Sequence, residues 1–458
     1  MEETISVVGL GKLGAPLAAC LAAKGMRVIG VDVDPHRVEA INDGQSPVYE
    51  PQLAEFICKA NGRLTATPDI AEAVAASEIT FIVVATPSES DGSFSLRYAL
   101  PVCKEIGRAL SAKPGFHLVI LTSTAMPGMT GGPVRAAIEQ ASGKVAGRDF
   151  GLCYGPEFIA LGSVIRDFLN PDFVLIGESD PRSGAMLEAL YQEVCENAPP
   201  IVRMSLVSAE VAKLAVNTYV TTKISFANML ARICERLQGA DVDAVTKALG
   251  MDSRIGPKYL KGAISYGGPC FPRDNLALAA LARQVGAPAD IAEVTDHFNR
   301  AQIRWLADVA SAHCDGQRTV GILGLTYKPN TDVVEAATGL LLAEELISRG
   351  VRVIAYDPAG NRKAETFLEG TARIAACAEE CVQNAEVVVV TTPWPEFIHM
   401  RPEIWNGNRH NGSTSRVVID CWNVLGQLRG CHGIRYIRLG CAAQSQLEPT
   451  PELSSSLA

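Results

Sequence analysis

One cysteine, Cys270, lies where regular structure is interrupted. It follows a glycine pair and a proline in the stretch YGGPCFPRDN, residues 266–275, and a second proline and an Arg-Asp pair come after it. A cysteine that serves only for packing usually lies inside an apolar helix or strand, whereas glycine and proline favour turns and loops. We therefore interpret Cys270 as a candidate nucleophile.

Residues that could activate such a thiol occur in the middle of the chain. Lys213 and Asn217 are four residues apart in an apolar-periodic segment, so they share one face if the segment is helical. Asp274 could position a water molecule, or it could cap a helix that starts near Asn275. A positive lysine beside the Cys270 thiol would lower its pKa and would face a developing alkoxide.

A glycine-rich turn near the start of the chain predicts a second site. Gly9, Gly11 and Gly14 form a G-x-G-x-x-G pattern directly after the strand-like run ISVV and directly before a predicted helix. In that context the glycines allow a tight turn and a close approach of the backbone to a pyrophosphate. The next predicted strand ends in Asp32, which can accept hydrogen bonds from ribose hydroxyls and would repel a 2′-phosphate. The pattern predicts NAD rather than NADP as the cofactor.

Together the two sites favour one type of chemistry. A hydride acceptor beside a nucleophilic thiol suits oxidation through a thiohemiacetal to a thioester, followed by hydrolysis. A free aldehyde would hydrate or escape after a first oxidation. A covalent adduct on Cys270 would hold it in place for a second.

Composition limits the classes of function. The chain of 458 residues is 48% hydrophobic and 20% charged, as in globular proteins, and its formal net charge of -9 argues against general nucleic-acid binding. The N-terminal stretch MEETISVVGLG lacks a basic region followed by an apolar core, and no apolar stretch has the length of a membrane span. We expect a cytoplasmic protein with no membrane partner. Its 13 cysteines should be mostly reduced, and without a C-x-x-C pair they predict no metal site.

Two segments of the chain resemble each other. ISVVGLGKLG and the following GMRVIGVDVDP are matched by TVGILGLTYKP, residues 319–329, and GVRVIAYDP. Each pair has the outline of a strand, a turn, a helix and a second strand. The second copy lacks the glycine fingerprint and has Lys328 there, which could bind another phosphate. The predicted fold class is α/β, with two Rossmann-like, doubly wound domains joined by a long central helix and a helical region.

Between the two copies, residues 205–250 contain an apolar-periodic pattern that predicts one long helix. Such a helix could span the molecule and supply a dimer surface. The predicted domains are an N-terminal NAD-binding domain (1–200), a central helical and dimerisation domain with the cysteine (201–312), a C-terminal Rossmann-like domain (313–437) and a tail of disorder-like composition (438–458).

The chain resembles the UDP-glucose/GDP-mannose dehydrogenase family from about residue 4 to about residue 425. The matching motifs are GLGKLGAPLA for the opening loop, VVATPSESDGS for V-x-T-P-x-x-x-x-G-x, STAMPG for S-T-V-x-P-G, YGPEF for N-P-E-F, AEVAKLAVNTY for A-E-x-x-K-L-x-x-N, SRIGPKYLK for R-I-G-x-x-[FY]-L-x and YGGPCFPRD for G-G-x-C-[FL]-x-[KR]-D. Members of this family oxidise the C6 alcohol of a nucleotide sugar to a uronic acid with two NAD⁺. The resemblance implies an NAD-dependent nucleotide-sugar 6-dehydrogenase whose C-terminal domain binds the nucleotide sugar.

The family's functional residues, carried over to matching positions, fall into three sets. The resemblance implies that Cys270 holds the aldehyde and then the thioester, and that Lys213 and Asp274 stabilise the oxyanion and position water. Asn217 would orient them, Glu157 would be a general acid/base, and Thr124 would order water near the nicotinamide. NAD would contact Gly9, Gly11, Gly14, Asp32, Arg37, Thr86, Thr124 and Arg273. The nucleotide sugar would contact Glu157, Lys213, Asn217, Arg254, Tyr259, Lys261, Tyr266, Gly267 and Lys328, with Arg254 supplied by a partner subunit of a homodimer or higher homo-oligomer.

Three departures from the family pattern bear on the substrate. Leu161 stands where many members have a second glutamate, and Glu335 stands where an arginine often contacts the cofactor. Trp422 and Asn423 replace an arginine that often meets the substrate. With Leu161, hydrolysis would rest on Glu157 alone or the sugar contacts would differ. The charge reversal at Glu335 and the lost arginine are not conservative at a site for a diphosphate. UDP-glucose, oxidised to UDP-glucuronate, is the default substrate, and a UDP-N-acetylhexosamine or another NDP-sugar stays open.

Two other functions also stay open. A two-electron dehydrogenase of the β-hydroxyacid or 6-phosphogluconate type would share the N-terminal nucleotide domain and an active lysine, but it would need neither Cys270 nor a second α/β domain. A catalytically inactive protein that binds nucleotide sugars would be consistent with the three departures, but it would not need the cysteine, lysine and aspartate together.

Overall fold

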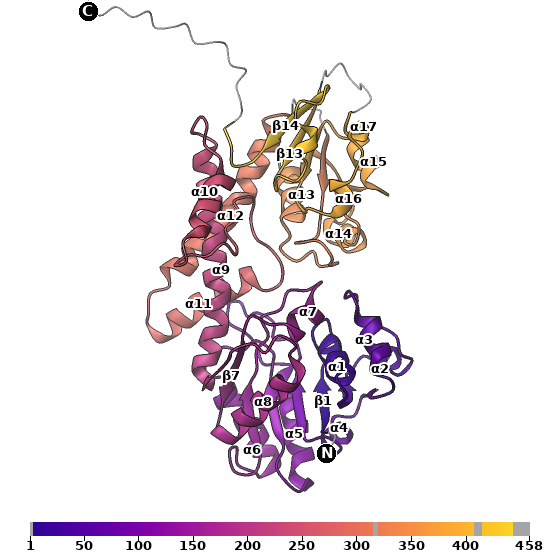
Figure 1. Ribbon diagram of the computed structural model, residues 1–458, viewed down its shortest axis with the longest axis vertical. Coiled ribbons are helices and arrows are strands. Elements are labelled where there is room, and N and C mark those ends of the chain that lie inside the picture. Colours follow the sequence, from indigo (N-terminus) through magenta and orange to yellow (C-terminus); the bar gives the residue numbers. More distant parts are fainter. Residues whose placement is uncertain (1–2, 315–318, 407–414, 443–458) are drawn as a thin grey trace, which may run out of the picture. The chain divides into compact units, whose positions relative to one another are not determined.

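The computed structural model describes residues 3–314, 319–406 and 415–442, which form two compact units (Figure 1). Within these limits, the first unit comprises residues 3–219, 270–294 and 330–332, and the second comprises the others. None of the helices in the described ranges combines the length and the hydropathy of a membrane span.

The first unit is built on a mostly parallel sheet. Among the described residues this sheet has eight strands, in the order β3-β2-β1-β4-β5-β6-β7-β8. Their bounds are β1 (Thr4–Val8), β2 (Arg27–Val31), β3 (Leu64–Thr67), β4 (Ile79–Ile82), β5 (Leu118–Leu121), β6 (Gly151–Tyr154), β7 (Val174–Glu178) and β8 (Ile201–Ser205). The first six follow the order of a dinucleotide-binding fold. β7 pairs antiparallel with β6, whereas β7 and β8 are parallel to each other.

Helices cover both faces of this sheet, which explains its apolar strands. β4 (ITFI) and β5 (LVIL) are buried at every position, as expected of central parallel strands. The helices of this unit are α1 (Gly14–Ala23), α2 (Pro35–Asn42), α3 (Leu53–Lys59), α4 (Ile70–Ala75), α5 (Ala99–Ala112), the π-helix η1 (Thr130–Val134), α6 (Arg135–Ser142), α7 (Val164–Leu169), α8 (Pro181–Val194) and α11 (Phe271–Val285).

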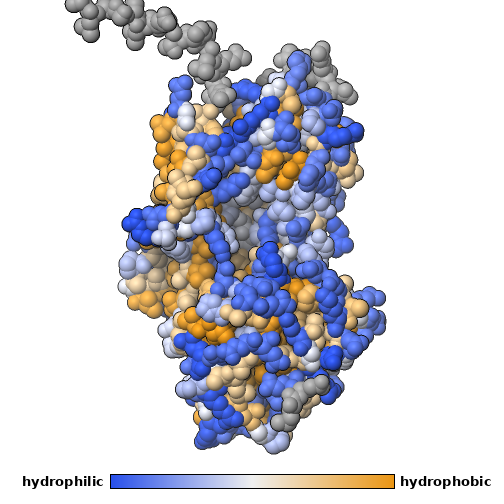
Figure 2. Space-filling view, in the orientation of Figure 1, coloured by the Kyte–Doolittle hydropathy of each residue, from blue (hydrophilic) through white to orange (hydrophobic). Residues whose placement is uncertain are grey.

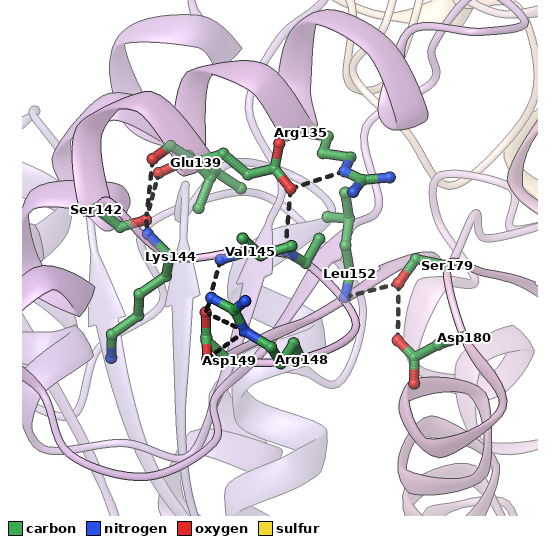
Figure 3. A network of polar contacts seen from close by, with 12 residues as sticks. Arg135, Glu139, Ser142, Lys144, Val145, Arg148, Asp149, Leu152, Ser179 and Asp180 are labelled. Atoms are coloured by element: carbon green, nitrogen blue, oxygen red, sulfur yellow. Dashed lines mark hydrogen bonds and ion pairs between the residues drawn. The ribbon is translucent and has the colours of Figure 1, made fainter.

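The entry into β6 is fixed by polar side chains (Figure 3). Glu139 on α6 accepts hydrogen bonds from the Arg135 guanidinium at 2.9 Å and from the Ala146 N–H at 3.0 Å. The Leu152 N–H donates to the Ser179 hydroxyl at 3.3 Å. These bonds fix the strand that leads directly into the P-E-F segment.

The second unit repeats the same design. Within the residues that the structure describes, its sheet has six parallel strands in the order β11-β10-β9-β12-β13-β14. The strands are β9 (Thr319–Leu323), β10 (Arg352–Tyr356), β11 (Arg373–Ile374), β12 (Val387–Val390), β13 (Arg416–Asp420) and β14 (Ile434–Arg438). The helices are α10 (Val242–Met251), α13 (Thr338–Ser348), α14 (Asn361–Leu368), α15 (Ala378–Gln383), α16 (Pro395–Ile398), α17 (Pro402–Trp405) and the short 3-10 helix η2 (Gly426–Leu428). The prediction of two Rossmann-like domains is confirmed.

Two long helices belong partly to each unit. They are α9 (Leu206–Cys234) and α12 (Asp290–Ser311). The prediction of one helix over residues 205–250 is wrong at its C-terminal end, because α9 stops at Cys234 and α10 follows as a separate helix. Gly239, with φ of 82°, lies in the turn between them and adopts a backbone conformation that favours glycine.

The chain after residue 437 continues to contact the second unit. Arg438 belongs to β14, and the Gly440 N–H donates to the Glu235 carboxylate at 2.9 Å. Residues 443–458 of the predicted tail lie outside the described residues.

Candidate functional site

The glycine loop between β1 and α1 has the geometry of a pyrophosphate site. A Cβ on Gly9, whose φ is 102°, would lie 2.3 Å from the Val83 carbonyl oxygen, and one on Gly14 would lie 1.8 Å from the Gly9 oxygen. These two glycines are therefore needed for the turn itself. A Cβ on Gly11 would meet only the Arg37 guanidinium, at 3.9 Å. The space in front of Gly11 is open to a ligand, as close approach of a pyrophosphate to the backbone requires.

Asp32 ties the end of β2 to this loop. Its carboxylate accepts hydrogen bonds from the Leu10 N–H at 2.7 Å and the Asp34 N–H at 2.9 Å. The Arg37 guanidinium lies 3.2 Å from the same carboxylate and 3.5 Å from that of Asp34. The loop thus holds an anionic acceptor where a ribose would lie, and Arg37 is placed beside it. The residues present fit NAD.

Thr86, Thr124 and Arg273 are brought together beyond the end of β4. The Thr86 hydroxyl donates to the Thr124 carbonyl at 2.7 Å, and the Arg273 guanidinium donates to the Thr86 carbonyl at 2.9 Å. The Ser123 hydroxyl accepts from the Val84 N–H at 2.9 Å and so joins the segment after β5 to the one after β4. Arg273 comes from α11, so the same bonds place Cys270 beside these two loops.

Cys270 is the N-cap residue of α11, and the helix begins at Phe271. The alternative in which Asp274 caps a helix starting near Asn275 is therefore wrong: Asp274 is buried in the first turn, and its N–H donates to the Cys270 carbonyl at 2.8 Å. Proline is well accepted in a first helical turn, so Pro272 does not delay the helix. The partial positive charge of a helix N-terminus favours a thiolate at Cys270.

Two polar residues of α9, Asn217 and Lys213, complete the arrangement around Cys270. Asn217 donates to the Asp274 carboxylate at 2.6 Å, and the Lys213 ammonium donates to the Glu157 carbonyl at 2.6 Å. Lys213 also lies 4.6 Å from the centre of the Phe158 ring, and its side chain is buried. The predicted catalytic residues thus lie within the first unit, on α9, at the start of α11 and in the segments after β5 and β6.

The pKa values of two of these groups are raised. For the Cys270 thiol, desolvation and the Asp274 charge raise the pKa, whereas Lys213 and Arg273 lower it, and the net direction is upward although the residue keeps access to solvent. Desolvation also raises the pKa of Asp274, against the effects of Lys213, Asn217 and Arg273. The expectation that lysine lowers the thiol pKa is correct for that pair but is outweighed by burial. Cys270 therefore needs a base when it attacks.

Glu157 is a partly buried carboxyl with one phenol partner. The Tyr191 hydroxyl on α8 donates to its Oε1 atom at 2.7 Å. Burial raises the pKa of Glu157 to about 7, although Tyr191 and Lys213 both lower it. A carboxyl that titrates near neutral pH is suited to general acid/base work.

Two residues near the site had no role in the sequence prediction. Tyr191 lies in an amphipathic helix, where a tyrosine is ordinary in a core, so no sequence signal marks it. Glu210 is buried on α9 and accepts hydrogen bonds from the Gly128 N–H at 2.6 Å and the Thr130 N–H at 2.8 Å. Its spacing from Lys213 and Asn217 puts it on their helical face, and that spacing could have identified it.

Most of the predicted substrate residues belong to the second unit, where some of them are adjacent. Both backbone polar groups of Tyr266 bond to the Asn299 side chain, and a Cβ on Gly267 would lie 2.1 Å from the Ala336 carbonyl oxygen. A Cβ on the following Gly268 would lie 2.7 Å from the Tyr327 ring, beside Lys328. The segments 266–268, 327–329 and 333–337 therefore form one corner of this unit.

Arg254, Tyr259 and Lys261 are exposed and lie on the segment after α10. The Arg254 side chain is 86% exposed and pairs with the Asp252 carboxylate at 2.6 Å.

Most of the residues that depart from the family pattern make hydrogen bonds in the structure. The Trp422 indole donates to the Thr391 carbonyl at 2.8 Å, and the Asn423 amide donates to Asp243 at 2.9 Å. The Glu335 side chain is exposed, and its carbonyl accepts from the Gly268 N–H at 3.0 Å. Leu161 supplies no carboxylate to the segment that carries Glu157.

Three family models match consecutive parts of the chain. They are the NAD binding domain (residues 3–195), the central domain (207–301) and the UDP binding domain (321–427) of the UDP-glucose/GDP-mannose dehydrogenase family.

Relatives along most of the chain agree with these matches. The chain is 34% identical to a UDP-glucose 6-dehydrogenase of Haloferax volcanii over 93% of this chain and 98% of that protein. It is 37% identical to a GDP-mannose 6-dehydrogenase of Pseudomonas putida over 77% and 80% of the two chains. A solved UDP-glucose dehydrogenase from Pyrobaculum islandicum superposes with a TM-score of 0.87 at 34% identity, covering 97% of this chain and 98% of that one. With the glycine loop, Asp32 and the cysteine site in place, the chain belongs to the UDP-glucose/GDP-mannose dehydrogenase family, with NAD as its cofactor.

Proposed function

We propose that the protein oxidises the C6 hydroxyl of a nucleotide sugar to a carboxylate through a thiohemiacetal and a thioester on Cys270. The observation that carries this proposal is the position of Cys270 at the N-terminus of α11. Asp274 in the first turn of that helix accepts a hydrogen bond from Asn217, and Lys213 lies on the same face of α9 as Asn217. Relatives that are 6-dehydrogenases of nucleotide sugars support the same reaction.

The dinucleotide loop would hold the cofactor at the first site. Gly9, Gly11 and Gly14 would accept the pyrophosphate, and Asp32 would accept hydrogen bonds from a ribose. When bound, two NAD⁺ molecules in succession each accept one hydride, so that alcohol and one water become carboxylate. Hydrogen bonds among Thr86, Thr124 and Arg273 join the segments after β4 and β5 to the start of α11, where Cys270 lies.

The side chains around Cys270 would carry the covalent steps. The thiol loses its proton to water, the sulfur adds to the C6 aldehyde, and the Lys213 ammonium stabilises the alkoxide that forms until it takes up a proton from water. Oxidation removes a hydride from C6 and a proton from the hydroxyl, which leaves a thioester. A water molecule then loses a proton to Glu157 and adds to the thioester carbon, and the C–S bond breaks. Cys270 regains a proton, and Asp274 and Asn217 orient the water.

UDP-glucose is the proposed substrate. The match to a UDP binding domain over residues 321–427 supports a uridine nucleotide, whereas relatives at similar identity include GDP-mannose 6-dehydrogenases. The purified protein should be incubated with NAD⁺ and UDP-glucose, UDP-N-acetylglucosamine, UDP-N-acetylmannosamine or GDP-mannose, and the products identified by mass spectrometry. We expect UDP-glucuronate from UDP-glucose. A uronate from another sugar alone would overturn the substrate, and none from any sugar would overturn the reaction.

Replacing Asp32 should weaken the preference for NAD. In Asp32→Ser the carboxylate that accepts from ribose hydroxyls and repels a 2′-phosphate is lost, so the ratio of the NADPH to the NADH dissociation constant should fall about 10- to 100-fold. Equilibrium binding measured by NAD(P)H fluorescence tests this without a substrate. Asp69→Ser is the matched control, because Asp69 caps α4 and has no contact with the glycine loop. An unchanged ratio in Asp32→Ser would contradict the assignment.

We also propose that the protein is a homodimer that uses the outer face of α9 and α10. Several apolar side chains on or between these helices are exposed, among them Phe226 (48%) on α9, Leu237 (54%) in the turn and Met251 (75%) on α10, and Figure 2 shows apolar residues in orange over α10. Others on the same elements are Met229, Ile233 and Val245. An apolar stripe of this kind is typical of an interface between chains. The exposed Arg254 would reach a partner's substrate site from there.

A charge in this stripe should dissociate the dimer. Phe226→Glu should raise the dimer dissociation constant at least about 100-fold, because it puts a carboxylate into an apolar contact. Sedimentation velocity measures the change, and Phe367→Glu, at an exposed phenylalanine of α14, is the matched control. A wild-type protein that sediments as a monomer with full activity would refute the dimer.

A further inference from the structure

We propose that Tyr191 is a positioning residue for Glu157, holding its carboxyl group in the orientation and the ionised form in which it takes a proton from water. This inference rests on the proposed function, and it gives that function a residue that the family pattern does not supply. Tyr191 does not touch the reacting atoms and would act only through Glu157.

The contact between the two side chains is short and is shielded from solvent on the tyrosine side. The Tyr191 hydroxyl donates to Glu157 Oε1 at 2.7 Å, and the tyrosine is 4% exposed. Its ring lies in the main core of the first unit, with its centroid 6.3 Å from that of Phe168. A hydroxyl on a ring fixed by packing restricts the carboxyl to one rotamer. Among the described residues, Oε2 has no hydrogen-bond partner, so this second oxygen can accept from water.

A glycine gives the hydroxyl its path to the carboxyl. Gly155 stands where the N-P-E-F motif has asparagine. A Cβ at this position would lie 3.6 Å from the Tyr191 hydroxyl oxygen and 3.0 Å from a methyl group of Ile120. A side chain at this position would therefore press against Ile120 and would lie in contact with the tyrosine hydroxyl. In this chain Leu161 also replaces the second glutamate of the family pattern. The hydrogen-bond partner that orients Glu157 is Tyr191, on α8.

The groups that face Glu157 allow a change in its pKa to be attributed to the hydrogen bond with Tyr191. Tyr191 on α8 and Lys213 on α9 both stabilise the ionised carboxyl, against a pKa raised to about 7 by burial. Cys20 on α1 and Cys195 after α8 also face it, but burial raises their pKa values to about 12 and about 11, with a smaller contribution from the Glu157 charge in each case. The pKa of Tyr191 is raised well above its ordinary value by burial and by Glu157. Between pH 5 and 9 the cysteines stay neutral and Tyr191 stays a hydrogen-bond donor.

The test is the pH dependence of thioester hydrolysis in Tyr191→Phe, which removes one hydroxyl and keeps the ring. Glu157 must be ionised to accept a proton, so the rate rises as pH rises through its pKa. Loss of a donor destabilises the carboxylate and raises that pKa. We expect the midpoint to move up by about one pH unit, with about a fivefold loss at pH 7 and recovery near pH 9. The first oxidation, followed in a rapid single turnover, should keep its rate.

Two further variants serve as controls. Tyr154→Phe removes another buried phenol hydroxyl from the same segment, one that makes no hydrogen bond to Glu157, and should leave the midpoint unchanged. Glu157→Gln should abolish the titration. A uniform loss of rate in Tyr191→Phe at every pH, with the wild-type midpoint, would overturn the proposal and leave Tyr191 a packing residue.

An infrared titration without substrate separates this inference from the proposed function. The difference in the protonated carboxyl band between wild type and Glu157→Gln reports the Glu157 midpoint directly, and the same measurement on Tyr191→Phe should give the higher value. If wild type forms no uronate, the proposed function fails while this titration still tests the contact. Equal midpoints in the infrared experiment would refute the contact even in an active enzyme.

Discussion

Cys270→Ser is expected to lose uronate formation by at least about 1,000-fold, the scale of loss seen when a catalytic nucleophile is removed. A serine hydroxyl is ionised far less than a thiol at neutral pH, so it neither adds to the aldehyde at a useful rate nor forms a thioester that water can cleave. The variant should fold normally, because Cys270 is exposed and its side chain makes no cap hydrogen bond in α11. The measurement is uronate formed per enzyme at saturating NAD⁺ and sugar.

The matched control for this variant is Cys58→Ser. Cys58 is also exposed and lies in α3 of the same unit, so its substitution should leave the rate unchanged. A two-electron dehydrogenase would keep its oxidation rate in Cys270→Ser, and a protein that only binds nucleotide sugars would show no rate to lose. Either result would contradict covalent catalysis by Cys270.

Lys213→Met should reduce the turnover number about 100- to 1,000-fold, the scale found when a group that stabilises an oxyanion is removed. Methionine keeps most of the length of the buried side chain but removes the ammonium group that we propose stabilises the oxyanion. Lys213 also lowers the pKa of the Cys270 thiol, so its loss should raise that pKa further. Alkylation of Cys270 by iodoacetamide should then need a higher pH, and its pH profile measures this shift without any substrate.

Lys59→Met serves as the control for Lys213→Met. Lys59 is exposed on α3 and pairs with Glu55 in the next turn, so neither turnover nor the alkylation profile should change. An alkylation midpoint in Lys213→Met equal to that of wild type would show that Lys213 does not act on the thiol.

The parts of the fold that depend on local patterns could be predicted from the sequence. The G-x-G-x-x-G turn between a buried strand and a helix fixed the first domain, because Gly9 and Gly14 leave no room for a side chain. The repeat of the same outline near residue 319 identified the second. The antiparallel pairing of β7 with β6 has no local signal, since strand direction is set by where the chain returns to the sheet.

Helix ends were harder to predict. A run without glycine or proline predicted α9, but apolar periodicity continues into α10 and masks the break near Gly239. The prolines around Cys270 suggested a loop, whereas Pro272 fits a first helical turn. That difference matters for the chemistry, because it places Cys270 at the N-terminus of α11.

The residues of the first-unit site came from motif spacing, but their electrostatics did not. Burial outweighs the lysine at Cys270 and raises the pKa of Glu157, and burial depends on tertiary packing that a single sequence does not reveal. Tyr191 reaches Glu157 from a helix more than thirty residues away in the chain, so only the folded structure connects them.

The central claim is a four-electron oxidation by one protein, and the number of NADH molecules formed per sugar consumed tests it most directly. The assay combines absorbance of NADH with chromatographic measurement of the nucleotide sugar and its uronate, at limiting sugar and excess NAD⁺. The account predicts two NADH for each UDP-glucose consumed, with UDP-glucuronate as the product and no free aldehyde. One NADH for each sugar, with an aldehyde or ketone as the product, would contradict it.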